Sequence, residues 1–383
     1  MTRRLQCALP FLESRHSARP RFRPRILLCL LLGILCMRSN PAQAIPVYSR
    51  QFNVPCSTCH TVAPRLNKFG YAFQANQFNW PGEKPRPRQD VSRYLPITTL
   101  TTYSYANDLT GRQETADIRS FELFFSSGLG FDHGRQGGYF IDLVAAVTGE
   151  DGTNGDLENA YVSVPVLGRR GQLALTLGQM TPLMYQNDPI NSLADTLPYG
   201  LTEGVDNFAF AEPTPMIRLD YFDNRGKISA DGNYLSLAVP FRGHLELTRQ
   251  GTVQAGSGIF AHAFHRQGYL TYGALGYFHK GSTLAGLIGT YACRERIYLT
   301  GVATLGHEPR LNTTHLSLEA EYLPNRRLSF TGRAELIGGD RSELASVAAI
   351  NYYPLANSYL RLSAENHQRR TDRAIELTVR VQY

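Results

Sequence analysis

The chain has 383 residues and a formal net charge of +7 at pH 7. Its first 44 residues hold eight Arg and one acidic residue, 8 − 1 = +7, so the rest of the chain is formally neutral, with 31 basic and 31 acidic residues. A formally neutral net charge gives no support for a nucleic-acid partner, so that class is set aside. Of six cysteines, only Cys56, Cys59 and Cys293 lie beyond residue 44, which excludes a disulfide scaffold.

A basic stretch, an apolar run from Ile26 to Met37 and the small-residue site Ala42-Gln43-Ala44 predict an export signal over residues 1–44. The apolar run is too short to span a bilayer as a helix. Arg3-Arg4 suggests a twin-arginine signal, but the apolar run begins far downstream of it. Cys36 suggests a lipoprotein, but the residue before it is Leu rather than the small residue that such processing needs. We therefore expect an ordinary signal and a protein that functions beyond the inner membrane.

The pattern C-x-x-C-H occurs once, as Cys56-Ser57-Thr58-Cys59-His60. At this spacing two thiols can reach the two vinyl groups of one porphyrin, while the adjacent imidazole faces the iron. A redox dithiol or half of a zinc site are the alternatives, but a second cysteine pair and a β-α-β context are both missing. The motif predicts one covalent c-type haem, bound through Cys56 and Cys59, with His60 as the metal ligand.

After the motif, a helix is expected with Pro64 in its first turn. Val62, Leu66, Phe69 and Phe73 recur at helical spacing and predict one apolar face against the porphyrin.

The ligand on the other side of the iron is not evident, because no Met occurs between residues 38 and 179 and no His between 61 and 132. Either a distant residue reaches the iron, or the position is open or ligated by Lys or Asn. The distant candidates are Met180, Met184, His262 and His265.

From residue 93 to 383 the sequence consists of short segments with period-two alternation, separated by Gly, Pro, Asn and Asp turns. In the last segment Ile375, Leu377, Val379, Val381 and Tyr383 alternate with Glu376, Thr378, Arg380 and Gln382. A soluble sandwich also alternates, but 21 Tyr and 19 Phe, many near strand ends, favour the interfacial belts of a membrane barrel. A mainly β fold is predicted, a transmembrane antiparallel up-and-down barrel of about 16 to 18 strands. A small α-helical haem segment, residues 45–92, would plug it.

Short turns at Leu323–Arg326 and Pro354–Asn357 are expected on the periplasmic side, where the first strand also begins. Longer outer connections are expected at Asn107–Asp117, Gly149–Asp156, Met180–Glu203, Asp223–Asn233 and His307–Thr313. Val205–Phe210 is expected to form one further strand. Acidic residues in the outer connections could ligate Fe(II) transiently or be ordinary turn residues, namely Glu150, Asp151, Asp156, Asp188, Asp195 and Glu203.

The stretch Cys56-x-x-Cys59-His60, Pro64, Leu66-Asn67, Phe69-Gly70, Phe73 and Asn76, followed at once by the barrel, resembles the fused outer-membrane cytochrome-porins of iron-oxidising bacteria and their relatives. The resemblance covers the architecture of the mature chain and specific motifs only near the haem. It implies a monohaem domain inside a porin-like barrel in the outer membrane. Electrons would cross that membrane, in the best-known members from extracellular Fe(II) to a periplasmic cytochrome.

Two other functions stay open. A transport porin would use the haem segment only as a plug, and lumen charges such as Arg327, Arg333, Arg361 and Arg380 would set its selectivity; in an electron conduit these would pair with neighbouring Glu. A haem enzyme such as a peroxidase is compatible with the missing second ligand. The chain is thus expected to be an electron-transfer protein, with Fe(II) oxidation and peroxidase activity as open enzymatic options.

Overall fold

The computed structural model describes residues 47–52, 54–80, 97–108, 114–131, 135–145, 155–169, 171–183, 193–194, 197–202, 205, 208–227, 229–241, 258–309, 311–339, 342–355, 358–367 and 373–382. Helices α2 (Val47–Phe52), η1 (Cys56–Thr58) and α3 (Lys68–Ala75) precede the strands, and α4 (Tyr199–Thr202) lies between two of them. None of the helices in these ranges combines the length and the apolar character needed to cross a bilayer.

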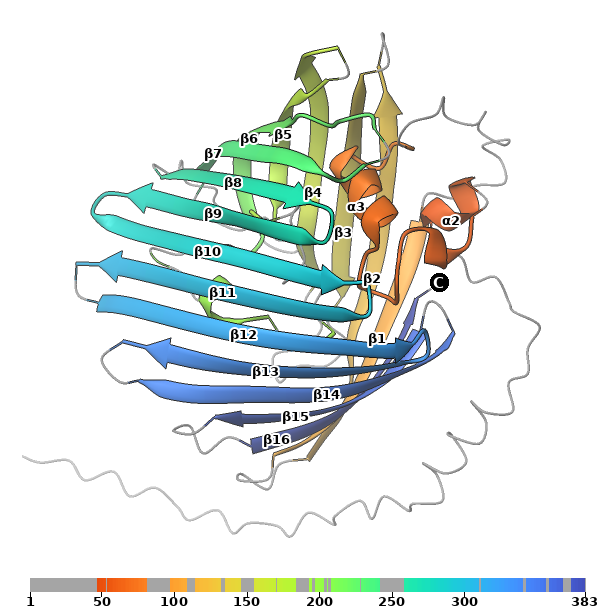
Figure 1. Ribbon diagram of the computed structural model, residues 1–383, viewed down its shortest axis with the longest axis vertical. Helices are drawn as coiled ribbons and strands as arrows, with labels where there is room; N and C mark the ends of the chain where they lie inside the picture. The colour runs from red at the N-terminus through yellow and green to blue at the C-terminus, as the bar shows by residue number, and fades with distance from the viewer. Residues whose placement is uncertain are drawn as a thin grey trace, which may run out of the picture. The chain divides into compact units, whose positions relative to one another are not determined.

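The described strands form one closed barrel of sixteen strands, in which each strand pairs antiparallel with its neighbours in the chain (Figure 1). The strands are β1 (Ile97–Asp108), β2 (Glu114–Gly130), β3 (Gln136–Ala145), β4 (Gly155–Leu167), β5 (Leu173–Met180), β6 (Thr214–Phe222), β7 (Gly232–Pro240), β8 (Ile259–Gln267), β9 (Leu270–His279), β10 (Ser282–Cys293), β11 (Ile297–Glu308), β12 (Leu311–Asn325), β13 (Leu328–Gly338), β14 (Glu343–Leu355), β15 (Ser358–His367) and β16 (Arg373–Gln382). Pairing of β1 with β16 closes the wall. The predicted up-and-down barrel is confirmed, at the lower end of the expected strand number.

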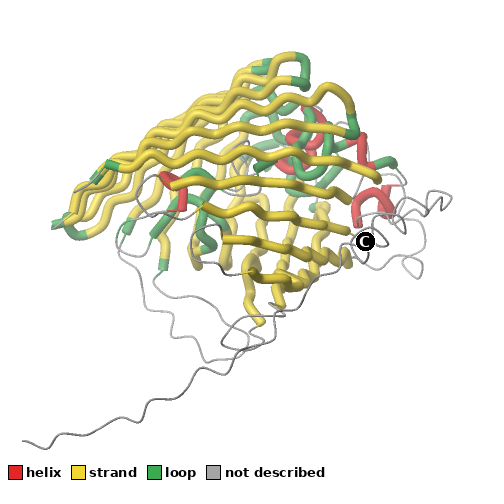
Figure 2. The backbone as a smooth tube through the Cα atoms, turned by 90° about the horizontal axis from the view of Figure 1, so that it is seen from below, coloured by secondary structure: helices red, strands yellow, loops and turns green. Residues whose placement is uncertain are grey.

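The two faces of the wall differ as the period-two pattern predicts. On β12, Leu316 and Leu318 point outward and are 45% and 61% exposed, whereas Glu319 and Glu321 point inward and are 5% and 1% exposed. Successive side chains of a strand face opposite sides, so every strand presents one set to each side. An apolar outer face around a polar interior is the surface of a barrel that spans a membrane. Figure 2 shows the strands forming one continuous curved wall.

The start of β1 and the end of β16 lie at the same end of the barrel, because Leu100 pairs with Gln382. We call this the terminal end, and the opposite one the loop end. The connection Asp223–Asn233 lies at the terminal end, so its predicted outer position is wrong. The reason is that Val205–Phe210 adds no strand to the wall: Val205 and Phe208 form only an isolated bridge, so β5 ends and β6 begins at the loop end.

The connection between β5 and β6 folds into the lumen. Its Leu183, Leu193 and Leu201 are fully buried, and its backbone bonds to inward-facing side chains of the wall. Leu193 N donates to Glu321 Oε1 at 2.6 Å, and Tyr199 N donates to Glu335 Oε2 at 2.7 Å. Protein therefore occupies this part of the lumen.

Candidate functional site

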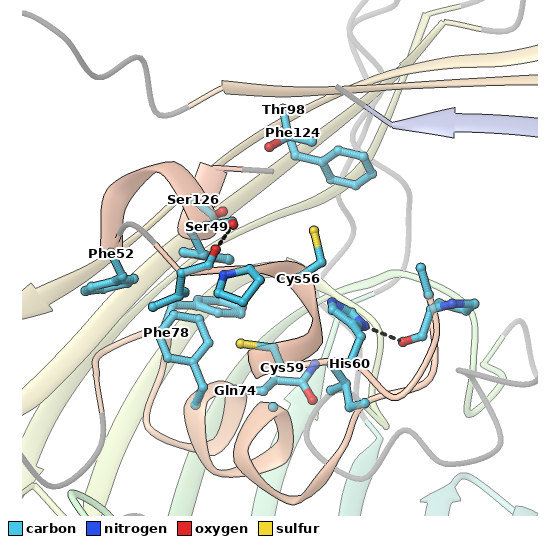
Figure 3. Close-up of a pocket in the computed structure, with 18 of the residues that line it drawn as sticks. Ser49, Phe52, Cys56, Cys59, His60, Gln74, Phe78, Thr98, Phe124 and Ser126 are labelled. Carbon is cyan, nitrogen blue, oxygen red and sulfur yellow. Dashed lines mark hydrogen bonds between the residues drawn. The ribbon is translucent and has the colours of Figure 1, made fainter. Parts of the chain in front are cut away.

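Cys56, Cys59 and His60 converge on one cavity because the motif winds into a tight turn (Figure 3). The backbone of Cys59 donates to Cys56 O at 3.1 Å, and that of His60 donates to the same carbonyl at 2.9 Å. Short-range bonds of this kind define the single 3₁₀ turn η1. The two thiols and the imidazole thus come from one compact element and line the same space.

Asn67 and Gly70 hold α3 against this turn. Asn67 Nδ2 donates to Ser57 O and Thr58 O, each at 3.1 Å, while its Oδ1 accepts from Gly70 N at 2.9 Å and caps the helix. A Cβ on Gly70 would lie 2.1 Å from Cys59 O, so only glycine permits this approach. Asn67 and Gly70 belong to the stretch that resembles the cytochrome-porins. The cap formed by Asn67 and the close approach at Gly70 explain why these residue types occur there.

His60 Nδ1 lies 3.2 Å from Pro64 O. A metal-ligating His commonly donates its other ring N–H to a carbonyl, which fixes the tautomer and leaves Nε2 for the metal. The expected place of Pro64 in the first helical turn is wrong, since α3 begins at Lys68 with Asn67 as its cap. Val62 and Leu66 precede the helix, so they are not part of its apolar face.

Burial controls the protonation of the three motif side chains. It raises the pKa of Cys56. Burial, together with the nearby Cys56, raises the pKa of Cys59 to about 12. Burial also lowers the pKa of His60, against the backbone hydrogen bonds to Pro64 and Arg65 that raise it. At neutral pH the site therefore holds two neutral thiols and a neutral imidazole, the form of His that binds a metal.

The cavity has a volume of about 340 Å³, within the usual range of roughly 300 to 1,000 Å³ for a ligand pocket. Aromatic rings wall it: Tyr48 and Phe73 have centroids 4.9 Å apart, and Phe52 and Trp80 5.0 Å. The barrel supplies the remaining wall through Thr98, Leu100, Phe124, Ser126, Phe140, Tyr359 and Arg380. The cavity is therefore shared between the N-terminal segment, by which we mean residues 47–80, and the inner wall at the terminal end.

These residues fit a c-type haem. The two thiols of the C-x-x-C spacing and an imidazole held by a carbonyl are the groups that would bind it, and apolar aromatic side chains wall the same cavity.

The predicted second ligands do not line this cavity. Met180 is fully buried in the core of the lumen, and His262 is buried between Phe260 and Phe264, with ring centroids 5.5 and 5.3 Å away. His265 Nδ1 is 2.9 Å from Asn233 Oδ1 at the terminal end. Met184 lies outside the described residues. Of the four candidates, the three that the structure describes are therefore not placed to ligate a haem on Cys56 and Cys59.

Polar contacts to the wall anchor the N-terminal segment. Buried Arg65 forms an ion pair with buried Glu321, and its guanidinium lies 4.7 Å from the ring centre of Tyr298. Asn76 Nδ2 donates to Lys227 O at 3.1 Å, and Asn79 Nδ2 donates to Gly137 O at 2.6 Å. The sequence analysis did not identify these anchors. A usable signal was present in Glu321, a charged residue on the inward face of a strand.

The predicted lumen arginines separate into three groups. Arg333 bonds to Glu319 at 3.2 Å and Glu335 at 2.7 Å, the expected pairing with neighbouring Glu. Arg380 lines the cavity and also pairs with a Glu, since its guanidinium lies 4.0 Å from Glu122 Oε2. Arg361 Nε donates instead to Asn351 Oδ1 at 2.6 Å. Arg327 is exposed in the turn between β12 and β13, so its placement in the lumen is wrong.

The acidic residues predicted as Fe(II) ligands cannot be located. Glu150, Asp151, Asp188, Asp195 and Glu203 lie outside the described residues, and the side chain of Asp156 is likewise not described. Within the described ranges, no three His, Cys, Asp or Glu side chains gather as a metal site would require.

No family model and no curated protein matches this sequence. Among solved structures, OmpF of Salmonella typhi in complex with daunomycin matches with a TM-score of 0.59 and 11% identity, over 75% of this chain and 97% of that chain. An anion-selective porin from Comamonas acidovorans matches with a TM-score of 0.57 and 11% identity, over 75% and 98%. OmpT of Vibrio cholerae gives 0.52 and 8%, over 75% and 98%. The chain is thus similar in fold to porins, the β-barrels of bacterial outer membranes.

Proposed function

We propose that this protein is an outer-membrane c-type cytochrome in which a porin-like barrel holds one covalent haem at its periplasmic mouth and passes electrons across the membrane. The proposal rests on one observation. Cys56, Cys59 and His60 line the same apolar cavity, and the carbonyl of Pro64 fixes the imidazole of His60. The bound haem would supply a one-electron redox centre.

The residues of this chain would position and shield that centre. Cys56 and Cys59 would tether the porphyrin through thioether bonds, and His60 Nε2 would ligate the iron. Phe73, Phe78 and the barrel residue Phe124 would exclude water from it. Axial ligation, burial and nearby charge are the protein's means of tuning a haem potential, and Arg380 is the charged residue of this cavity.

The terminal end corresponds to the periplasmic side, because bacterial barrels carry their short turns there. The cavity lies at this end, so a periplasmic electron carrier, for example a cytochrome, is the near partner. The described residues of the β5–β6 connection occupy part of the lumen between the loop end and the cavity, so an extracellular donor would be separated from the cavity. Fe(II) remains the donor that the family resemblance implies.

The test begins with the full chain, produced with cytochrome c maturation and extracted from outer membranes. Haem that stays on the protein in a denaturing gel, and is lost in Cys56→Ala/Cys59→Ala, supports the proposal; Cys293→Ala is the matched control. The visible spectrum is then recorded under anoxia before and after Fe(II). Reduction by Fe(II) supports iron oxidation, and reduction by dithionite alone supports a conduit with another donor. Absence of covalent haem overturns the proposal.

A transport porin is the second candidate, and the similarity in fold to porins favours it. Against it, inward-facing charges such as Arg333 and Arg361 are buried by protein, whereas an open channel would leave them in contact with water. Solute flux through the purified barrel that does not change when haem is lost would favour a porin. A peroxidase would instead bind carbon monoxide at its ferrous haem.

A further inference from the structure

Positive charge collects at the terminal end, although the chain beyond residue 44 is formally neutral. Cationic side chains on its turns and at the start of α3 are exposed, namely Lys68, Arg169, Lys227, Arg294, Arg296, Arg326 and Arg327. We call this set the basic rim. On the same turns and on α3, no Asp or Glu among the described residues is fully exposed. Among the described residues the fully exposed charges of this end are therefore positive, beside the half-exposed Asp223, Asp231 and Glu295.

The acidic residues near the basic rim are held in local hydrogen bonds. Asp223 accepts from Asn233 N at 3.1 Å and from Asn233 Nδ2 at 2.7 Å. Asp231 accepts from Gly268 N at 2.8 Å. Such bonds fix the turns and orient these carboxylates toward the backbone. The cations of the rim thus dominate the face that a soluble partner would meet.

Two cations of the basic rim stand at positions where that residue type does not favour the local fold. Arg294 has φ of 50° in the tight turn between β10 and β11, where Asn or Gly is preferred. Lys68 is the first residue of α3, where the helix dipole disfavours a positive charge. Lys68 also lies on the segment that carries the haem motif, and its Nζ is 3.9 Å from the ring centre of Tyr269 on the neighbouring turn. Through Lys68, the basic rim therefore extends onto the segment that carries the motif.

We infer that the basic rim is a docking surface for the acidic face of a soluble periplasmic electron carrier protein. This inference rests on the proposed function and names the chemistry of its partner. Complementary charge raises association rates by about tenfold to a thousandfold, and the gain falls steeply with salt. The oxidised carrier accepts one electron from the ferrous haem, which is thereby oxidised to the ferric state, and no bond or proton is exchanged. Lys68 follows Asn67, whose side chain bonds to Ser57 O and Thr58 O inside the motif. This proximity favours a protein partner over lipid headgroups, which would meet only the outer turns.

The test uses the full-length holoprotein in phosphatidylcholine nanodiscs, first reduced with dithionite. Its reoxidation is followed in stopped flow with an acidic cupredoxin, and separately with a basic cytochrome c. The wild type is expected to react at least about tenfold faster with the acidic carrier at low salt, and to lose this preference at high salt. Arg294→Glu/Arg296→Glu/Arg326→Glu/Arg327→Glu is expected to reverse the preference. Lys280→Glu, an exposed cation at the loop end, is the control and should change nothing.

Equal rates with both carriers, or a quadruple variant that behaves as the wild type, would overturn the inference while the haem spectrum stays intact. A quadruple variant that loses only its binding to phosphatidylglycerol vesicles would show that the basic rim meets lipid and would overturn it too. Failure of the proposed function looks different, because a protein without covalent haem shows no reducible band in any variant.

Discussion

Replacing Glu321 with Gln would separate the N-terminal segment from the barrel wall. The carboxylate accepts from Arg65 through one oxygen and from Leu193 N through the other, so a single side chain joins this segment and the β5–β6 connection. Both side chains of the ion pair are buried, with relative exposures of 0% and 1%. A Gln amide oxygen can still accept from Leu193 N. The substitution therefore acts mainly on the charge of Arg65.

Removing one partner of a buried ion pair leaves an uncompensated charge, which costs roughly 3 to 5 kcal/mol. In the Gln variant the single amide oxygen accepts from Leu193 N and the amide NH2 faces Arg65, so the lower end of this range, about 3 kcal/mol, is the minimum to expect. Each 1.4 kcal/mol corresponds to a tenfold change in an equilibrium constant. The equilibrium between docked and released segment should therefore shift by on the order of a hundredfold toward release.

Limited proteolysis of the folded protein measures this equilibrium, since cleavage follows the open population when closing is fast. Glu321→Gln should lose residues before β1 at least tenfold faster than the wild type, while the barrel remains resistant. Glu319→Gln is the matched control, because Glu319 is a neighbouring buried carboxylate of the same strand that pairs with Arg333. Arg65→Met/Glu321→Leu should recover much of the protection, since an apolar pair can replace a buried ion pair. Equal cleavage of Glu321→Gln and Glu319→Gln would refute the role given to this pair.

Four further substitutions test separate parts of the structure. Gly70→Ala places a Cβ 2.1 Å from Cys59 O, so haem absorbance per folded barrel should fall, and an unchanged ratio would contradict the packing argument. Asn67→Ala removes the cap of α3, which should destabilise the segment by about 1 kcal/mol, read from the denaturant midpoint of the haem band; Asn67→Asp, which keeps the acceptor, should lose less. Leu318→Arg puts a charge on the outer face, at a cost of roughly 2 to 4 kcal/mol near the membrane centre, and should lower the yield of heat-modifiable barrel on gels. Arg380→Gln removes a cation from the cavity wall, so spectroelectrochemistry should give a more negative midpoint potential, because positive charge favours the reduced iron; a constant potential would place Arg380 away from the haem.

The barrel could be predicted because the alternation of apolar and polar residues is a local property of each strand. Along β12, Leu316 and Leu318 alternate with Ser317 and Glu319, and a period of two identifies the faces without knowledge of the partners. The path of Val205–Phe210 could not be predicted in this way, because a short apolar run reads alike whether it crosses the wall or fills the lumen. Because Val205–Phe210 was counted as a strand, the connection Asp223–Asn233 was assigned to the wrong end of the barrel.

The motif residues could be predicted from the chemistry that their spacing serves. The residues around them in the cavity could not be predicted. Spacing alone predicts Cys56, Cys59 and His60 as neighbours, whereas the fixing of His60 by Pro64 depends on where α3 begins. The barrel residues that line the cavity, such as Tyr359 and Arg380, lie far from the motif in the sequence. Contacts of that range arise from closure of the barrel, which no local pattern encodes.

The cavity lies across the seam where the barrel closes. Its wall includes Thr98 and Leu100 from β1 and Arg380 from β16, the first and last strands, whose pairing closes the barrel. Under the proposed function, attachment of a porphyrin to Cys56 and Cys59 would come before the seam forms, while the segment is still accessible to the maturation enzymes. A chain that reached closure without its haem would leave the seam packed against an empty space on one side. Cofactor delivery and insertion into the outer membrane would then be consecutive stages of one biogenesis pathway, in which closure completes the pocket.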